Sequence, residues 1–118
     1  MLNIETIREH CLKKQAVTES FPFDNDTLVF KVAGKIFALL SLDGNFGLNL
    51  KCNPEKALEL REQYSDITPG YHMNKTHWNT LNLDGNIKSQ LVFELIDHSY
   101  KIVTQSLTMK TKKEFNLL

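Results

Sequence analysis

The chain has 118 residues, of which 42% are hydrophobic and 24% are charged. This size and balance are typical of one globular domain, so we expect residues 1–118 to form a single domain. Lysine plus arginine and aspartate plus glutamate both count 14, giving a formal net charge of zero. A neutral chain excludes the strongly basic class of nucleic-acid binders, so any polyanion site must be a local patch. Because the sequence shows neither a long apolar run nor a secretory signal, we expect a cytoplasmic protein.

The first predicted elements are a helix and a β-hairpin. Asn3 is a suitable N-cap for a helix over residues 4–14, in which apolar residues recur at helical spacing. The β-rich runs at residues 27–32 and 35–40 are separated only by Ala33-Gly34, which is the pattern of a tight hairpin.

Between that helix and the hairpin, residues 16–26 carry Phe21-Pro22-Phe23 followed by Asp24-Asn25-Asp26. Proline interrupts regular structure and the aspartate–asparagine cluster favours a turn, so the segment is predicted to be a loop. We expect its two phenylalanines to anchor the loop on the core.

The later elements are predicted in this order: a strand over residues 47–52, a helix over 54–64 capped by Asn53, a loop over 67–76, a strand over 77–83, a long helix capped by Asn86 and a short helix over 109–115. Short links between the first three strands favour antiparallel pairing. The predicted fold class is therefore α+β, an antiparallel β-sheet with helices packed on one face.

The alternation of side chains in two strands suggests a functional face. In the strand over 77–83, Trp78 and Thr80 share the face opposite Leu81. In the strand over 47–52, Asn49 and Lys51 share the polar face. If both strands are regular, these four residues lie on one surface beside the loop that precedes Trp78. The candidate nucleic-acid-binding residues are Asn49, Lys51, His72, Asn74, Lys75, Trp78 and Thr80.

Each residue type in this group suits a polyanion. Lysine neutralises phosphate, an exposed aromatic ring stacks on a base, and asparagine bonds to the backbone or to base edges. The alternative is structural: Trp78 covers the sheet edge or packs under the loop over 67–76, while His72 and Asn74 cap local backbone groups.

Metal binding and cofactor binding have little support. His72 and His77 are five residues apart, but no paired-cysteine or H-E-x-x-H pattern supplies further ligands. Cys11 and Cys52 are far apart and make no C-x-x-C pair, so we interpret them as small buried residues in a reducing compartment. We expect no metal and no cofactor.

Catalysis has even less support, because the chain lacks the nucleophile elbow, the P-loop and the G-x-G-x-x-G fingerprint. Asp97 and His98 are interpreted as solvated positions beside the apolar face of the long helix. The acidic residues of the helix over 54–64 are likewise interpreted as a solvated face. We name no catalytic residue and lean against an enzyme.

A family resemblance covers nearly the whole chain. The matching stretches are Phe21-Pro22-Phe23, Leu28-Val29-Phe30-Lys31-Val32, Gly34-Lys35-Ile36-Phe37-Ala38, Lys51-Cys52-Asn53-Pro54, Leu60-Arg61, His72-Met73-Asn74-Lys75-Thr76-His77-Trp78, Leu83-Asp84-Gly85, Leu95-Ile96 and Ser99-Tyr100. On these residues the chain resembles the MmcQ/YjbR family. The resemblance implies a CyaY-like fold and a proposed double-wing DNA-binding motif.

The functional hypothesis is a non-enzymatic, DNA-binding domain that uses the polar sheet face and the loop before Trp78. DNA is favoured by the family proposal and not by the net charge. The alternative is a small-molecule or protein-interaction module that uses the same surface. We expect a monomer and identify no protein partner and no membrane association.

Overall fold

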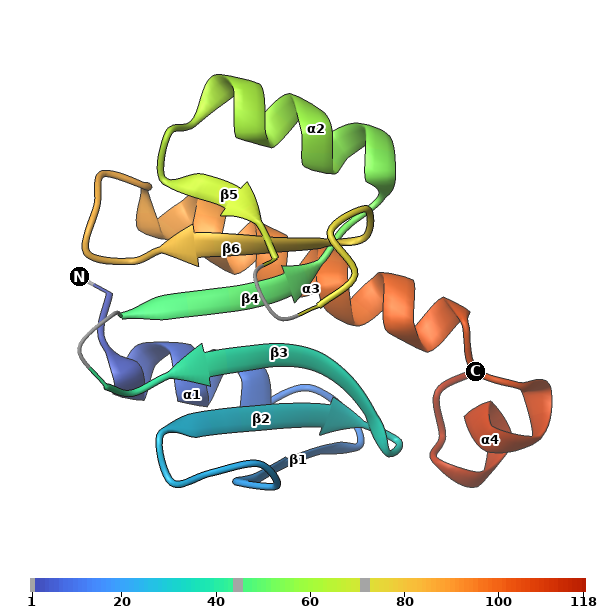
Figure 1. The fold of residues 1–118 in the computed structure, drawn as a ribbon. Helices are drawn as coiled ribbons and strands as arrows, with labels where there is room; N and C mark the ends of the chain where they lie inside the picture. Colours follow the sequence, from blue (N-terminus) through green and yellow to red (C-terminus); the bar gives the residue numbers. More distant parts are fainter. Residues whose placement is uncertain (1, 44–45, 71–72) are drawn as a thin grey trace.

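The computed structural model describes residues 2–43, 46–70 and 73–118. Within them, one antiparallel six-stranded sheet is accompanied by four helices (Figure 1). The elements are α1 (Ile4–Leu12), β1 (Val17–Ser20), β2 (Thr27–Val32), β3 (Lys35–Ser41), β4 (Gly47–Lys51), α2 (Pro54–Gln63), β5 (Ile67–Pro69), β6 (Trp78–Asn82), α3 (Ser89–Gln105) and α4 (Met109–Glu114). The strand order is β1-β2-β3-β4-β6-β5, and the predicted α+β class is confirmed. No helix in the described part of the chain is long and apolar enough to cross a bilayer.

The prediction missed the two outermost strands. β1 lies in the segment predicted as a loop over 16–26, and β5 lies in the one over 67–76. They have four and three residues respectively, which is too short for alternation to be visible. Each is held by one long neighbour, β1 by β2 and β5 by β6. Short edge strands also limit pairing with other chains.

Two of the three predicted helix caps are confirmed. Asn3 and Thr6 form a capping box, in which the Thr6 N–H donates to Asn3 Oδ1 at 2.8 Å. Asn53 Oδ1 accepts the first free N–H groups of α2. The prediction for Asn86 is wrong, since its N–H donates to Asp66 Oδ2 at 2.9 Å and α3 begins further along the chain.

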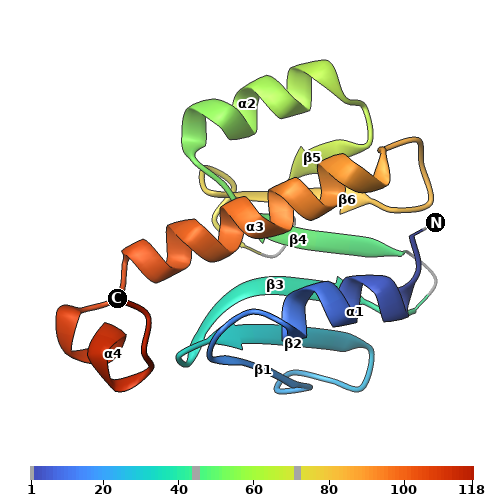
Figure 2. The ribbon, with the colours of Figure 1, turned by 180° about the vertical axis from the view of Figure 1, so that it is seen from behind.

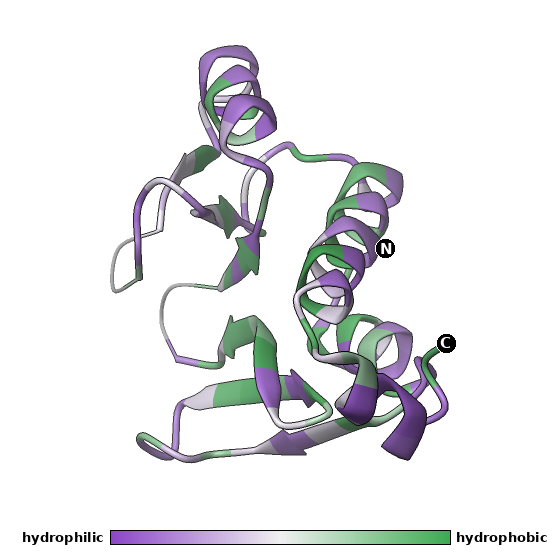
Figure 3. Cartoon of the chain, turned by 90° about the vertical axis from the view of Figure 1, so that its right-hand side faces the viewer, coloured by the Kyte–Doolittle hydropathy of each residue, from purple (hydrophilic) through white to green (hydrophobic). Residues whose placement is uncertain are grey.

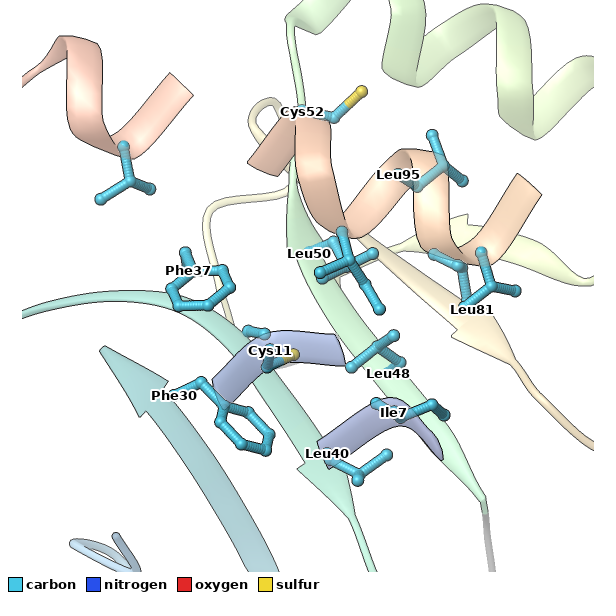
Figure 4. Close-up of a cluster of buried hydrophobic side chains, with 14 of the residues drawn as sticks. Ile7, Cys11, Phe30, Phe37, Leu40, Leu48, Leu50, Cys52, Leu81 and Leu95 are labelled. Atoms are coloured by element: carbon cyan, nitrogen blue, oxygen red, sulfur yellow. The ribbon is translucent and has the colours of Figure 1, made fainter. Parts of the chain in front are cut away.

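The main core lies between the sheet and the helices. One row of apolar residues crosses five strands in register: Leu28, Leu40, Leu48, Leu81 and Ile67. Ile7 and Cys11 of α1 and Leu95 of α3 pack onto this layer (Figure 4). Figure 3 views the molecule from the side and shows α1 and α3 as a layer on one side of the strands.

The predicted anchoring of Phe21 and Phe23 on the core is wrong. Their side chains are 47% and 67% exposed. Asp24 Oδ1 accepts the N–H groups of Asp26 and Thr27 at 2.8 and 2.7 Å, which closes a turn between β1 and β2. The two phenylalanines precede this turn and remain exposed. By contrast, Cys11 and Cys52 are buried and free, as predicted.

Candidate nucleic-acid interface

The sheet face turned away from α1 and α3 has its own row of paired residues. From β1 to β5 the successive partners are Ser20, Val29, Leu39, Asn49, Thr80 and Thr68. Partners in an antiparallel ladder point to the same side of the sheet. We call this surface the open face: it comprises that row together with the pairs Lys31–Ile36 and Lys51–Trp78.

The predicted grouping of the strand residues is confirmed. Lys51 is the register partner of Trp78, and Asn49 is the partner of Thr80. The Thr80 hydroxyl donates to Asn49 Oδ1 at 2.5 Å. The alternation in β4 and β6 therefore placed four of the seven candidate residues on one surface, as the sequence indicated.

Trp78 lies on the open face but is not exposed. Its side chain is only 8% accessible and packs with Val29 and Leu39, while Ile36 and Met73 lie against this cluster. The structure therefore matches the alternative in which the ring packs under the loop before it. A base cannot stack on an aromatic face that is already covered.

The loop that carries Lys75 is fixed to α2 by Arg61. The Arg61 guanidinium donates through Nε to Asn79 Oδ1 at 2.7 Å and through Nη2 to the carbonyl oxygens of Lys75 and Trp78. Asn79 is 2% exposed, and its Nδ2 donates to the Ala57 carbonyl oxygen. One side chain thus joins a helix, a loop and a strand.

Arg61 and Asn79 were missed as site-shaping residues. The available signal was the polarity of Asn79, which shares the core-facing side of β6 with Leu81. A buried amide at such a position requires a partner. Since sequence spacing does not reveal which residue of α2 approaches β6, Arg61 could not be named in advance.

The remaining candidates lie in the loop before Trp78. Asn74 Oδ1 accepts the Thr76 N–H at 2.8 Å, and the Asn74 carbonyl oxygen accepts the Trp78 N–H at 3.0 Å. Asn74 thus caps local backbone, which is the structural role considered for it. Lys75 is exposed. His72 lies outside the described residues.

Charge is distributed unevenly between the two faces of the sheet. The only acidic residue in the six strands, all of which the structure describes, is Glu19. Glu19 faces α1, where Arg8 Nε donates to Glu19 Oε1 at 2.7 Å, and this hydrogen bond lowers the Glu19 pKa. Lys31 and Lys51 lie on the open face and are partly exposed. The open face of the described strands therefore carries cations and no carboxylate.

Asp97 is exposed, as predicted, and His98 is half-buried, but both also make contacts with distant parts of the chain. Asp97 Oδ1 lies 2.7 Å from His10 Nε2 and 2.5 Å from Lys14 Nζ, so it joins α3 to the end of α1. His98 Nε2 accepts the Asn53 N–H at 3.3 Å. Burial lowers the His98 pKa, with nearby lysines adding to the effect. These contacts come from tertiary packing, which the alternation along α3 does not reveal.

Comparisons with known proteins identify relatives of this chain. The sequence model of a family described as YjbR matches residues 12–102. The uncharacterized protein YbdF of Escherichia coli O157:H7 is 38% identical over 110 residues, covering 92% of this chain and 90% of the relative. The uncharacterized protein YjbR of Escherichia coli K12 is 31% identical over 113 residues, covering 95% and 96% respectively.

Solved structures agree with the fold. A crystal structure of a Deinococcus radiodurans protein matches with a TM-score of 0.93 and 38% identity, covering all of this chain and 91% of that one. A Pseudomonas syringae protein matches with a TM-score of 0.75 and 28% identity, covering 86% of this chain and 98% of that one.

Proposed function

This chain belongs to the YjbR family, and we propose that the open face of its sheet binds the phosphate backbone of DNA. The observation that supports the proposal is the charge of that face: Lys31 and Lys51 lie on it, and the described strands place no carboxylate there. Lys75 adds a third exposed cation in the loop that leads into Trp78. A local patch of this kind suits a polyanion even though the chain is neutral.

The spacing of the cations favours contact with more than one phosphate. Lys31 lies in β2 and Lys51 in β4, two strand positions apart, which is roughly 10 Å at the usual strand separation. The ion pairs found in the described part of the chain, Arg8–Glu19, His10–Asp97 and Lys14–Asp97, involve none of the open-face lysines. Among the described residues, no carboxylate therefore pairs with Lys31 or Lys51.

The covered tryptophan alters the expected mode of binding. Because Trp78 is only 8% exposed and Met73 packs against its cluster, the proposal assigns the ring no stacking role. Thr80, Asn49 and Thr68 supply short polar groups on the same face, which suit phosphate and sugar oxygens. We therefore propose contact with the DNA backbone and little discrimination between sequences.

A salt titration of binding to labelled duplex DNA tests this proposal. The wild type is compared with Lys51→Ala/Lys75→Ala, and with the matched control Lys56→Ala/Lys101→Ala on exposed helix positions. Each phosphate contact contributes about 0.9 to the slope of log affinity against log salt concentration, so Lys51→Ala/Lys75→Ala should flatten the slope by about 1.8. The control variant should retain the wild-type slope.

The outcome that contradicts the proposal is an absence of binding at low salt, or equal slopes for the two double variants. The alternative is a small-molecule or protein-interaction module that uses the same surface. It predicts that Trp78 fluorescence responds to a metabolite or a peptide and not to oligonucleotides.

A further inference from the structure

Most of the exposed large apolar side chains belong to two short segments of the chain. Of the seven large apolar residues exposed in the described part of the chain, five lie in two segments. We call residues 21–26 the tip and residues 109–118 the tail. The tip contributes Phe21 and Phe23, and the tail contributes Met109, Phe115 and Leu118. Single exposed apolar residues are ordinary, but such groups indicate contact surfaces.

The tip ends in a hydrogen-bonded turn, and its two exposed phenylalanines precede that turn in the sequence. Asp24 accepts the N–H groups of Asp26 and Thr27, and these hydrogen bonds hold the Asp24 pKa below its usual value. Pro22 further restricts the backbone between the two phenylalanines. The tip therefore combines an exposed aromatic pair with the carboxylates of Asp24 and Asp26.

The tail is mainly cationic, since it holds Lys110, Lys112 and Lys113 and one acidic residue, Glu114. Thr108 Oγ1 accepts the Thr111 N–H at 3.1 Å at the start of α4, and Gln15 Nε2 donates to the Phe115 carbonyl oxygen at 3.5 Å. An open hollow of about 430 Å³ lies in this segment, lined by Lys112, Lys113, Asn116 and Leu118. Its walls are cationic and partly apolar, which suits an aromatic ring accompanied by carboxylates.

We propose that the tip of one molecule docks into the tail hollow of a second copy of this chain. Phe23, the more exposed phenylalanine, enters between Lys112 and Lys113, while Asp24 and Asp26 face the same lysines. Nucleic acid is disfavoured as the occupant of the tip because its carboxylates repel phosphate.

The contact joins different molecules because the two segments of one molecule lie far apart. The β1–β2 turn and α4 are on opposite sides of the fold in both Figure 1 and Figure 2. The contact is therefore head-to-tail and leaves one free tip and one free tail on each pair of molecules. Further copies can add at these free ends, so the assemblies grow longer as the protein concentration rises. Because a tip and a short tail bury little area, the association is weak and sensitive to salt. This departs from the monomer expected from the sequence.

Sedimentation velocity over a range of protein concentrations at low salt tests the proposal. The wild type should show a sedimentation coefficient that rises with concentration. The tip variant Phe21→Ser/Phe23→Ser and the tail variant Lys112→Glu/Lys113→Glu should each remain monomeric. Leu58→Ser, which removes an exposed apolar residue of α2 outside both segments, should associate like the wild type.

An equimolar mixture of the two variants provides the sharpest result. The tip variant retains an intact tail and the tail variant retains an intact tip, so the mixture should form heterodimers and nothing larger. A wild type that is monomeric at every concentration overturns the proposal. So does a mixture that remains monomeric under conditions where the wild type associates. DNA binding through the open face is measured independently and is unaffected by either result.

Discussion

The hydroxyl of Ser99, a fully buried side chain of α3, accepts a hydrogen bond from the backbone N–H of Lys51 at 2.9 Å. The same hydroxyl donates to the Phe37 carbonyl oxygen at 2.5 Å. Phe37 and Lys51 lie just beyond the last register pair between β3 and β4, which is Ala38–Leu50. A helix side chain thus bridges the two strands where their direct pairing stops, beside a lysine of the proposed binding face.

Replacing Ser99 with alanine should destabilise the fold. The change leaves the Lys51 N–H and the Phe37 carbonyl without their partner in a buried place, which costs roughly 1–3 kcal/mol. Urea unfolding measures this as a lower midpoint with an unchanged slope. Ser106→Ala is the control, because Ser106 is exposed and its hydroxyl donates to the nearby Val103 carbonyl oxygen at the end of α3. Equal midpoints for the two variants would contradict the bridging role.

Replacing Arg61 with methionine should expose the tryptophan. The variant keeps the apolar stem but loses the hydrogen bonds to Asn79 and to the carbonyl oxygens of Lys75 and Trp78. We expect the loop carrying Met73 to loosen and the emission of Trp78, the single tryptophan of the chain, to shift to longer wavelength. Arg8→Met serves as the control. An unshifted emission maximum in the Arg61 variant would show that the loop is held by other contacts.

The Cys11 thiol should resist chemical modification in the folded protein. Burial raises its pKa from 9.0 to about 12, so almost no reactive thiolate exists at pH 8. In the unfolded chain the Cys11 thiol loses its proton at the lower pKa. The free energy of unfolding therefore falls as the pH rises from 9 towards 12. Labelling with a thiol reagent should therefore be slow in buffer and fast in denaturant. Rapid labelling of Cys11 under native conditions would contradict this packing.

The contacts of Asp97 with His10 and Lys14 should contribute more stability as the pH rises from acid towards neutral. Burial raises the Asp97 pKa, but the hydrogen bonds from Lys14 and His10 outweigh it, so the pKa lies below its usual value. A lowered carboxyl pKa contributes stability above the unfolded pKa and loses it as the pH falls through the folded one. Because the side chain is 51% exposed, the contribution stays below about 1 kcal/mol.

Asp97→Asn tests those contacts. The difference in unfolding free energy between variant and wild type should be present at neutral pH and should vanish in acid. Asp43→Asn, at an exposed turn position, is the matched control and should show a smaller difference. If the difference in unfolding free energy between the wild type and Asp97→Asn is unchanged at low pH, the stabilising effect of Asp97 is not ionic.

The longer elements and the composition of the open face were predictable because they depend on local periodicity. The alternation in β4 and β6 placed Lys51, Trp78, Asn49 and Thr80 on one surface. The alternation could not show that Trp78 is covered. The Trp78 cluster is packed against by Met73, which lies in a loop whose sequence has no regular periodicity. The edge strands β1 and β5 were missed for a similar reason, because a three- or four-residue strand is specified by its partner and not by its own pattern.

The sequence by itself determined the family, the α+β class, the confirmed caps at Asn3 and Asn53, and which side chains of the central strands share a face. These features follow from residues a few positions apart, whose geometry the backbone repeats. Only the tertiary structure decided that Arg61 fixes the loop of Lys75, that Phe21 and Phe23 are exposed, and that Asp97 joins two helices. Those contacts join elements distant in sequence, and their partners are selected by how the helices pack against the sheet.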